Sequence, residues 1–159
     1  MQVVETKFGR FLKDGKRYRI RPSNGQTQQE RTAEALAAGY VVDVIGAHRL
    51  EKKTEIADAR YETEFGGFTD PTAGMFVRTD ERTRTLLTAA AVRAVSDPSY
   101  EVANWKTSDG SFITLTNAMI LALDQAVRDF IASQFAKEAE LTAQIDNAAT
   151  PEEVKSITW

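Results

Sequence analysis

The residues that could carry out acid–base or metal chemistry are few and poorly grouped. His48 is the only histidine, and Arg49, Lys52 and Lys53 are its neighbours in the sequence. A single histidine cannot build a two-histidine metal site, and no HExxH motif is present. The chain has no cysteine, which excludes thiolate nucleophiles, disulfides and cysteine-bound zinc. We therefore expect His48 to be structural or solvent-exposed, and we predict no metal site.

Carboxylate pairs are frequent, but their spacing does not bring two of them to one point. Adjacent and i,i+2 side chains diverge on a helix, and a spacing of five residues is poor for shared coordination. The pairs are Glu62 and Glu64, Asp80 and Glu81, Asp124 and Asp129, Glu138 and Glu140, and Glu152 and Glu153. Calcium-loop, phosphate-loop, dinucleotide and nucleophile-elbow motifs are all absent from the sequence. We predict a protein that is not an enzyme, with no catalytic residue and no cofactor.

The charge is distributed unevenly along the chain, although the net charge is only −3. Residues 1–53 contain 11 Lys and Arg against 6 Asp and Glu, a net charge of +5, and the rest contains 9 against 17, a net charge of −8. Opposite charges at the two ends favour head-to-tail association or contact of the N-terminal part with an acidic partner. The simpler alternative is two solvated faces that happen to differ in charge.

The length and composition are those of a globular protein with one domain, or with a small element attached to a domain of about 100 residues. The chain has 159 residues, of which 42% are hydrophobic and 27% charged. No apolar run approaches the roughly 18 residues of a membrane span, and the N-terminus lacks the apolar core of a signal peptide. We expect synthesis in a cytoplasm and no membrane partner.

The N-terminal third predicts a small unit with the order ββαβ. Asp14-Gly15 lies between two β-prone runs and indicates a hairpin turn. A type I turn with a glycine bulge would place Phe8, Leu12, Tyr18 and Ile20 on one face and Arg17, Arg19 and Arg21 on the other, whereas a one-residue register change would redistribute them. Thr27 and Glu30 form a capping box for a helix that reaches Ala38, and Gly39 ends it. The β-branched stretch 40–45 predicts a third strand in the same sheet.

The alternating arginines of this unit allow two interpretations. A basic ribbon can follow the phosphates of a nucleic acid. The protein as a whole is acidic, however, and it lacks a platform of several aromatic side chains for stacking bases. We favour docking of Arg17, Arg19 and Arg21 to an acidic protein surface, and treat a small nucleic-acid-binding regulator as a disfavoured alternative.

The central part predicts a connecting helix followed by a short strand and a second helix. Residues 47–66 carry a narrow apolar stripe in a charged run, and Gly66-Gly67 breaks the helix. Residues 74–79 indicate a short strand, and Asp80 can cap a helix that Asp97-Pro98 ends. We expect its buried face to contain Leu86, Leu87, Ala90, Val92 and Ala94.

The C-terminal part predicts a hairpin and one unusually long helix. Asp109-Gly110 forms the turn, and Thr116 or Asn117 caps a helix of about thirty residues, roughly 45 Å long. Leu141 and Ile145 near its far end could form an interface with another chain, including a second copy of this one. Alternatively, residues 150–159 fold back, with Thr150 as the cap and Pro151 at the first helical position, and Ile157 and Trp159 cover the stripe.

Four segments of the chain resemble a family of domains, without an assigned activity, that are encoded mostly by tailed bacteriophages and prophages. They are IADARYETEFGGF, MFVRTDERTRTLLTAAA, NWKTSDGSFITLTNAMILAL and the terminal TPEEVKSITW. The resemblance covers about residues 50–159, and domains of this family often accompany tail-fibre and fibre-assembly proteins. It implies a biological context but carries over no catalytic residues.

These observations together predict an α+β protein with a small N-terminal ββαβ unit and an α+β domain that has a β-hairpin and a long C-terminal helix. We expect a basic attachment unit at 1–46, a connecting helix at 47–66 and a tail-associated domain at 67–159. The resemblance implies a virion protein of the tail tip or tail-fibre region, present in the host cytoplasm during assembly, that docks fibre or baseplate subunits. A fibre-assembly chaperone that leaves the particle is the alternative. The candidate partner-binding residues are Phe11, Arg17, Arg19, Arg21, Leu141, Ile145 and Trp159.

Overall fold

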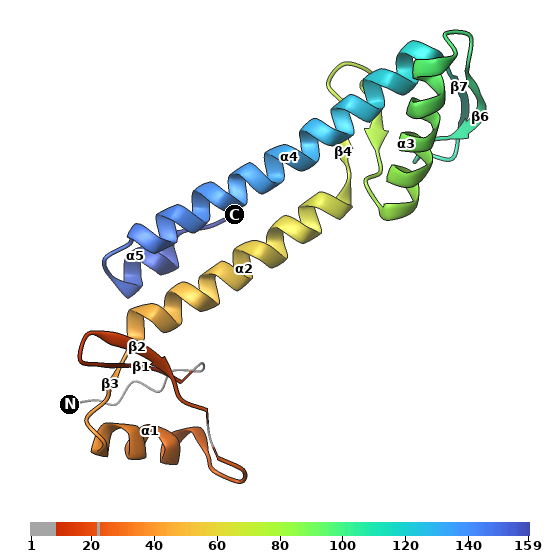
Figure 1. Cartoon of the computed structure of the whole chain (residues 1–159). Helices are drawn as coiled ribbons and strands as arrows, with labels where there is room; N and C mark the ends of the chain where they lie inside the picture. Colours follow the sequence, from red (N-terminus) through yellow and green to blue (C-terminus); the bar gives the residue numbers. More distant parts are fainter. Residues whose placement is uncertain (1–8, 22) are drawn as a thin grey trace. The chain divides into compact units, whose positions relative to one another are not determined.

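The computed structural model describes residues 9–21 and 23–159 and shows an α+β fold (Figure 1), which confirms the predicted fold class. The strands are β1 Arg10–Lys13, β2 Lys16–Arg19, β3 Val41–Val42, β4 Phe68–Thr69, β5 Phe76–Val77, β6 Val102–Lys106 and β7 Phe112–Leu115. The helices are α1 Gln28–Ala37, α2 Val44–Gly66, α3 Glu81–Ser96, α4 Asn117–Asn147 and α5 Pro151–Ser156. None of the helices in this described part is both long and apolar enough to cross a membrane.

The chain divides into two compact units, and each is considered by itself. Unit 1 contains the residues up to Ala57 together with Glu140–Trp159, and unit 2 contains Asp58–Ala139. The division therefore falls inside α2 and again inside α4. The domain boundaries expected from the sequence, 46/47 and 66/67, followed the ends of predicted elements and stay a prediction. The two compact units divide the chain differently, because both long helices contribute residues to both units.

The sheet of unit 1 is antiparallel, with the strand order β2-β1-β3. Asp14 and Gly15 have φ angles of 51° and 72°, as a two-residue type I′ turn requires, and Lys13 pairs with Lys16. This turn twists in the same sense as the strands, so it displaces the expected glycine-bulge turn and changes the register. Phe11 therefore pairs with Tyr18, and Leu12 pairs with Arg17. Phe8, part of the expected apolar face, lies outside the described residues.

Helix α1 begins with the predicted capping box and covers the side of the sheet that carries Phe11. The Thr27 side chain accepts a hydrogen bond from the Glu30 amide, and the Glu30 carboxylate accepts one from the Thr27 amide at 2.8 Å. Phe11 is fully buried and makes an edge contact with Tyr40, while the guanidinium of Arg31 lies over its ring. Phe11 is thus part of the core of this unit.

The third strand is shorter than predicted, because a helix cap interrupts it. Strand β3 ends at Val42, and α2 begins at Val44, so the expected strand at 40–45 is wrong over its second half. The buried carboxylate of Asp43 accepts a hydrogen bond from the Gly46 amide at 2.9 Å, in the manner of an N-cap. The cap starts a helix at Val44, although Val44 and Ile45 have a preference for β-strands.

The C-terminal residues of unit 1 fold back on the end of α4, which is the second of the two alternatives considered above (Figure 1). Thr150 and Glu153 form a capping box, with Pro151 at the start of α5. A buried cluster results, and Ile157 and Trp159 pack against it. Its buried members are Ile56, Leu141, Ile145, Ala148 and Val154.

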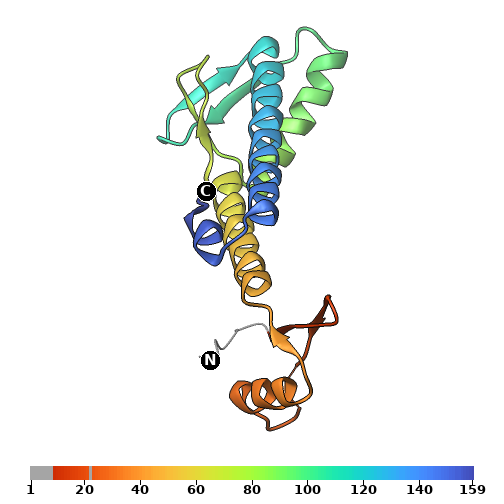
Figure 2. The ribbon, with the colours of Figure 1, turned by 90° about the vertical axis from the view of Figure 1, so that its left-hand side faces the viewer.

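The core of unit 2 lies between α3, the N-terminal part of α4 and the β6–β7 hairpin. In Figure 2, α3 and the hairpin lie on opposite sides of α4. Leu87, Ala90 and Ala94 face this core as predicted, but Leu86 and Val92 are 50% and 66% exposed. The helical period places Leu86 about a quarter turn from the centre of the buried stripe and Val92 nearly opposite it, so the predicted face was too wide. At the other end of the hairpin, Thr116 caps α4, and the Asn117 side chain donates to the carbonyl of Ala94 at 2.7 Å.

A buried charge network joins three helices within unit 2. Glu64, near the end of α2, is 5% exposed and pairs with Arg60 one turn earlier and with Arg84 of α3, the latter at 2.8 Å. Arg60 also pairs with Glu138 of α4 at 2.9 Å. Burial lowers the pKa of Arg60, but the hydrogen bonds from its guanidinium to Glu138 and Glu64 outweigh this effect and raise the pKa above its ordinary value. The hydroxyl of Thr79, which is also buried, donates to the Glu64 carbonyl.

Replacement of Gly46 by alanine tests the cap of α2. A Cβ atom at this position would lie 2.1 Å from the Asp43 carboxylate, which must then leave the cap. We expect Gly46→Ala to lower the free energy of unfolding by about 1 to 2 kcal/mol, the usual value of an N-cap. Gly66→Ala, on the same helix but with open space around its Cβ, is the control and should be neutral. Equal urea midpoints for the two variants would contradict the expectation.

Replacement of Glu64 by glutamine tests the charge network. Glu64→Gln removes the charge that compensates Arg60 and Arg84, so we expect the free energy of unfolding to fall by about 2 to 3 kcal/mol, less than for a fully buried pair because both arginines are partly exposed. Glu62→Gln, an exposed position two residues earlier on the same helix, is the matched control. Urea unfolding followed by circular dichroism measures both, and a loss no larger than that of the control would show that the network does not stabilise the unit.

Candidate binding groove

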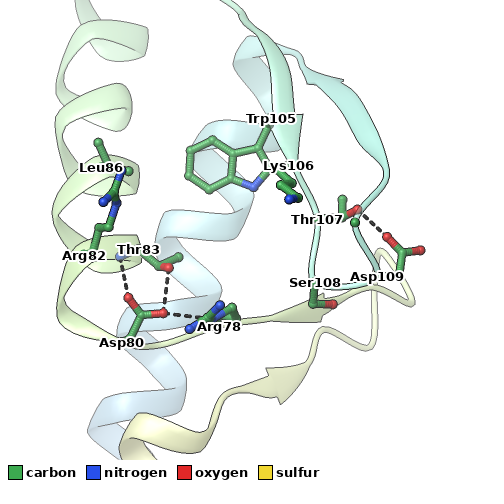
Figure 3. Close-up of a pocket in the computed structure, with 11 residues that line it drawn as sticks. Arg78, Asp80, Arg82, Thr83, Leu86, Trp105, Lys106, Thr107, Ser108 and Asp109 are labelled. Carbon is green, nitrogen blue, oxygen red and sulfur yellow. Dashed lines mark hydrogen bonds and ion pairs between the residues drawn. The ribbon is translucent and has the colours of Figure 1, made fainter.

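A groove of about 610 Å³ lies in unit 2 between the start of α3 and the turn of the β6–β7 hairpin (Figure 3). One wall comes from the segment that leads into α3 and from its first turns. The other wall comes from the end of β6 and the hairpin turn. The lining residues are Arg78, Asp80, Arg82, Thr83 and Leu86 on the first wall, and Trp105, Lys106, Thr107, Ser108, Asp109 and Gly110 on the second.

A β-bulge positions Trp105 between the hydrophobic core and the groove. Val102 pairs with Leu115 and Trp105 with Ile113, so the register shifts between the two residues, and Asn104 there has a φ of 57°. In a regular strand, side chains three positions apart point to opposite faces. The bulge instead lets both Val102 and Trp105 pack against the core cluster. Figure 3 shows the indole ring between the hairpin and α3, with Leu86 and Arg82 on the helix across from it.

The two carboxylates of the groove are engaged by neighbouring residues. Asp80 caps α3, accepting from the Thr83 amide at 3.0 Å and the Thr83 hydroxyl at 2.9 Å, and it pairs with Arg78 at 3.1 Å. The hydrogen bond from the Thr83 amide is the main reason that the pKa of Asp80 is lowered. The Thr83 hydroxyl and Arg78 lower it further, while burial has a smaller, opposite effect. Asp109 accepts from the Thr107 hydroxyl and the Ser111 amide, which lower its pKa in the same way. Both groups are therefore ionised at neutral pH.

Two cations of the groove have no such partner. Arg82 and Lys106 form no ion pair with any carboxylate in the part of the chain that the structure describes, and Lys106 only approaches the ring of Phe112 at 5.9 Å. They stand on opposite walls, one on α3 and one on β6. The groove thus presents two cations without an ion-pair partner beside an indole ring and a half-exposed leucine, and its lining, with Arg78, Asp80 and Asp109 included, has a net charge of +1.

This arrangement is suited to binding rather than to proton transfer. A general acid or base works best with a pKa near the working pH, whereas Asp80 and Asp109 have lowered pKa values and already accept hydrogen bonds. Within residues 9–21 and 23–159, no group of three or more side chains is placed to hold a metal ion. His48 belongs to unit 1, where it is half-buried in α2.

The residues predicted to bind partners lie in unit 1, and the structure does not bring them to one site. Arg17 and Arg19 share a face of β2, but Arg17 Nε pairs with the buried Asp43 carboxylate at 3.3 Å. Arg19 and Arg21 are exposed. The remaining candidates belong to hydrophobic cores: Phe11 beneath α1, and Leu141, Ile145 and Trp159 in the cluster around α5.

A smaller hollow of about 140 Å³ in unit 1 gathers basic residues, but at least three of the four are engaged by neighbouring groups. Arg17 pairs with Asp43, and Lys53 donates to both carboxylate oxygens of Asp146 at 2.7 Å. Arg49 donates to the carbonyl of Ala148, also at 2.7 Å. The groove of unit 2 is the stronger candidate for a binding site. The sequence analysis did not predict this groove. In the sequence, the one indication of it was Trp105 next to Lys106 in a predicted hairpin.

Comparison with known proteins identifies the family but not its activity. The family described as Domain of unknown function (DUF4376) matches residues 47–158. The chain belongs to this family. Its matched region contains the whole of unit 2, and hence the groove. Searches of curated proteins and of solved structures each found no significant match.

The acid dependence of stability tests the role assigned to Asp80. Because the folded-state pKa of Asp80 is lowered, its charge stabilises the fold above the ordinary aspartate pKa of about 3.9, and this contribution is lost as the pH falls through the lowered value. Asn is an equally good cap but carries no charge. We expect wild type to exceed Asp80→Asn in free energy of unfolding by about 0.5 to 1 kcal/mol at pH 6, and the difference to shrink in acid.

Urea unfolding at a series of pH values measures this difference. Glu81→Gln, which removes one negative charge at the next residue, controls for a general change of charge. A difference between wild type and Asp80→Asn that does not vary with pH would contradict the assignment.

Proposed function

We propose that this protein is a non-enzymatic adaptor of a phage particle, located in the tail tip or tail-fibre region, that docks fibre or baseplate subunits. The phage context rests on the resemblance of residues 50–159 to domains that accompany tail-fibre proteins. The adaptor role rests on the groove of unit 2, which offers cations without ion-pair partners together with apolar surface. Its two carboxylates have lowered pKa values and already accept hydrogen bonds from neighbouring residues. That combination is the observation on which the proposal depends.

Unit 1 would supply the second contact of the adaptor. Its apolar candidates are covered by the chain itself, so the docking function falls to the exposed Arg19 and Arg21 and, in part, to Arg17. Side chains of this kind suit an acidic protein surface. Leu141 and Ile145 no longer favour self-association through α4, because α5 and Trp159 of the same chain cover these two side chains. Sedimentation of the purified chain would detect it directly.

Mass spectrometry of purified particles tests the proposal. For a phage or induced prophage whose genome encodes the chain, we expect it in a fixed ratio to the tail proteins. The lysate from the same culture is the control for expression. Absence from particles, with abundance in the lysate, would overturn the structural role and favour the fibre-assembly chaperone. Coexpression with the fibre protein would then be informative, because a chaperone should raise the soluble yield of fibre.

A further inference from the structure

We propose that the groove of unit 2 binds a short acidic segment of a partner protein that carries one large apolar side chain. This inference rests on the proposed adaptor function and names the chemistry of the partner. It assigns Arg82 and Lys106 to the acidic side chains of that segment, and Leu86 with the exposed part of Trp105 to its apolar side chain.

The charge of the groove favours an acidic partner. Unit 2 as a whole contains 8 Lys and Arg against 12 Asp and Glu, a net charge of −4, whereas the groove lining has three cations against two carboxylates, so its positive charge is a local feature. Arg78 adds a third cation, and its side chain is 66% exposed although Nε is engaged by Asp80. Carboxylates of a partner can form charge-assisted hydrogen bonds with Arg82 and Lys106, which no carboxylate of the groove engages.

The apolar part of the groove favours a partner that carries an apolar side chain as well as negative charge. Leu86 is 50% exposed and does not belong to the core cluster of unit 2, and the Trp105 ring stands across from it. Aromatic side chains at the centre of a contact, with charged residues around them, are the usual anchors of protein interfaces. A volume of about 610 Å³ is in the range of ligand-binding clefts, which is ample for one side chain and the adjoining backbone.

The β6 strand favours an extended segment. The sheets β4–β5 and β6–β7 each have two strands, so β6 pairs with β7 on one side only. A narrower hollow of about 60 Å³ continues the groove between β5 and β6, sharing Arg78, Thr83 and Trp105 with it. Unpaired strand edges accept extended peptides, with the backbone giving affinity and alternate side chains giving specificity.

A nucleic acid fits the same groove less well. Single-strand binding uses several stacked aromatic rings along a basic track, whereas this groove offers one indole, part of which packs in the core. The negative charge of unit 2 would also repel a phosphate backbone beyond the groove. An oligonucleotide is therefore a competitor in the test rather than the proposed ligand.

Trp105 provides the readout for a binding experiment on the full chain. The sequence has two tryptophans, so a Trp159→Phe background leaves Trp105 as the only one. The probes are short synthetic peptides in which Asp and Glu flank a single Phe or Leu at varied positions. We expect saturable changes in Trp105 emission, with Kd values in the micromolar range that rise with added salt.

Three variants in this background separate the groove from the basic surface of unit 1. Arg82→Glu together with Lys106→Glu should raise Kd at least tenfold, and Leu86→Ala should raise it severalfold. Arg19→Glu, an exposed charge reversal in unit 1, is the matched control and should change Kd less than twofold. Circular dichroism checks that each variant is folded. Peptides with Ala in place of the apolar residue, or Lys in place of the acids, should bind at least tenfold more weakly.

Four results would overturn the inference: no binding by any acidic peptide, no effect of the groove variants, an equal effect of Arg19→Glu, or tighter binding of a single-stranded oligonucleotide at the groove. Its failure is distinguishable from failure of the proposed function. A chain present in particles but unable to bind the peptides keeps the adaptor role and loses this inference. Specific peptide binding by a chain absent from particles keeps the inference and loses the virion role.

Discussion

The buried carboxylate of Glu64 is the group on which the arrangement of unit 2 depends. Arg60 and Arg84 reach it from α2 and α3, and Arg60 also holds Glu138 of α4. A carboxylate withdrawn from water is strongly unfavourable without such partners, so these helices must keep the positions in which the charges meet. The start of α3 is thereby fixed, and with it the wall of the groove that carries Asp80, Arg82 and Leu86. One wall of the candidate groove is therefore held in place by the way in which one internal charge is neutralised.

Features that depend on a few neighbouring residues could be predicted from the sequence. The positions of the turns at Asp14-Gly15 and Asp109-Gly110, the capping box at Thr27, the cap at Thr150 and the helix end at Gly66 are of this kind, because each is decided by local hydrogen bonds and φ angles. The errors arose where local preferences compete. Val44 and Ile45 favour a strand, but the cap formed by Asp43 starts a helix there. Leu86 and Val92 are apolar, yet the helical period carries them past the edge of the buried face.

The candidate site could not be predicted, because contacts distant in sequence create it. Nothing in the order of residues shows that the bulge at Asn104 lets Trp105 face the core and the groove, or that Arg82 lacks a carboxylate partner while Arg84 has one. The converse holds for unit 1. Leu141, Ile145 and Trp159 have the composition of an interface, and only the placement of α5 shows that the chain covers them itself. An apolar stripe predicts burial, but it does not identify what buries it.

The course of the chain through the two units has an evolutionary consequence. Unit 2 is one continuous segment, Asp58–Ala139, and the residues of unit 1 precede and follow it. The two ends of that segment adjoin, since Arg60 Nε lies 2.9 Å from the Glu138 carboxylate. A segment that leaves and rejoins its host at neighbouring points satisfies the geometric condition for domain insertion. Because the junctions fall inside α2 and α4, a segment inserted in this way is joined to its host by two uninterrupted helices.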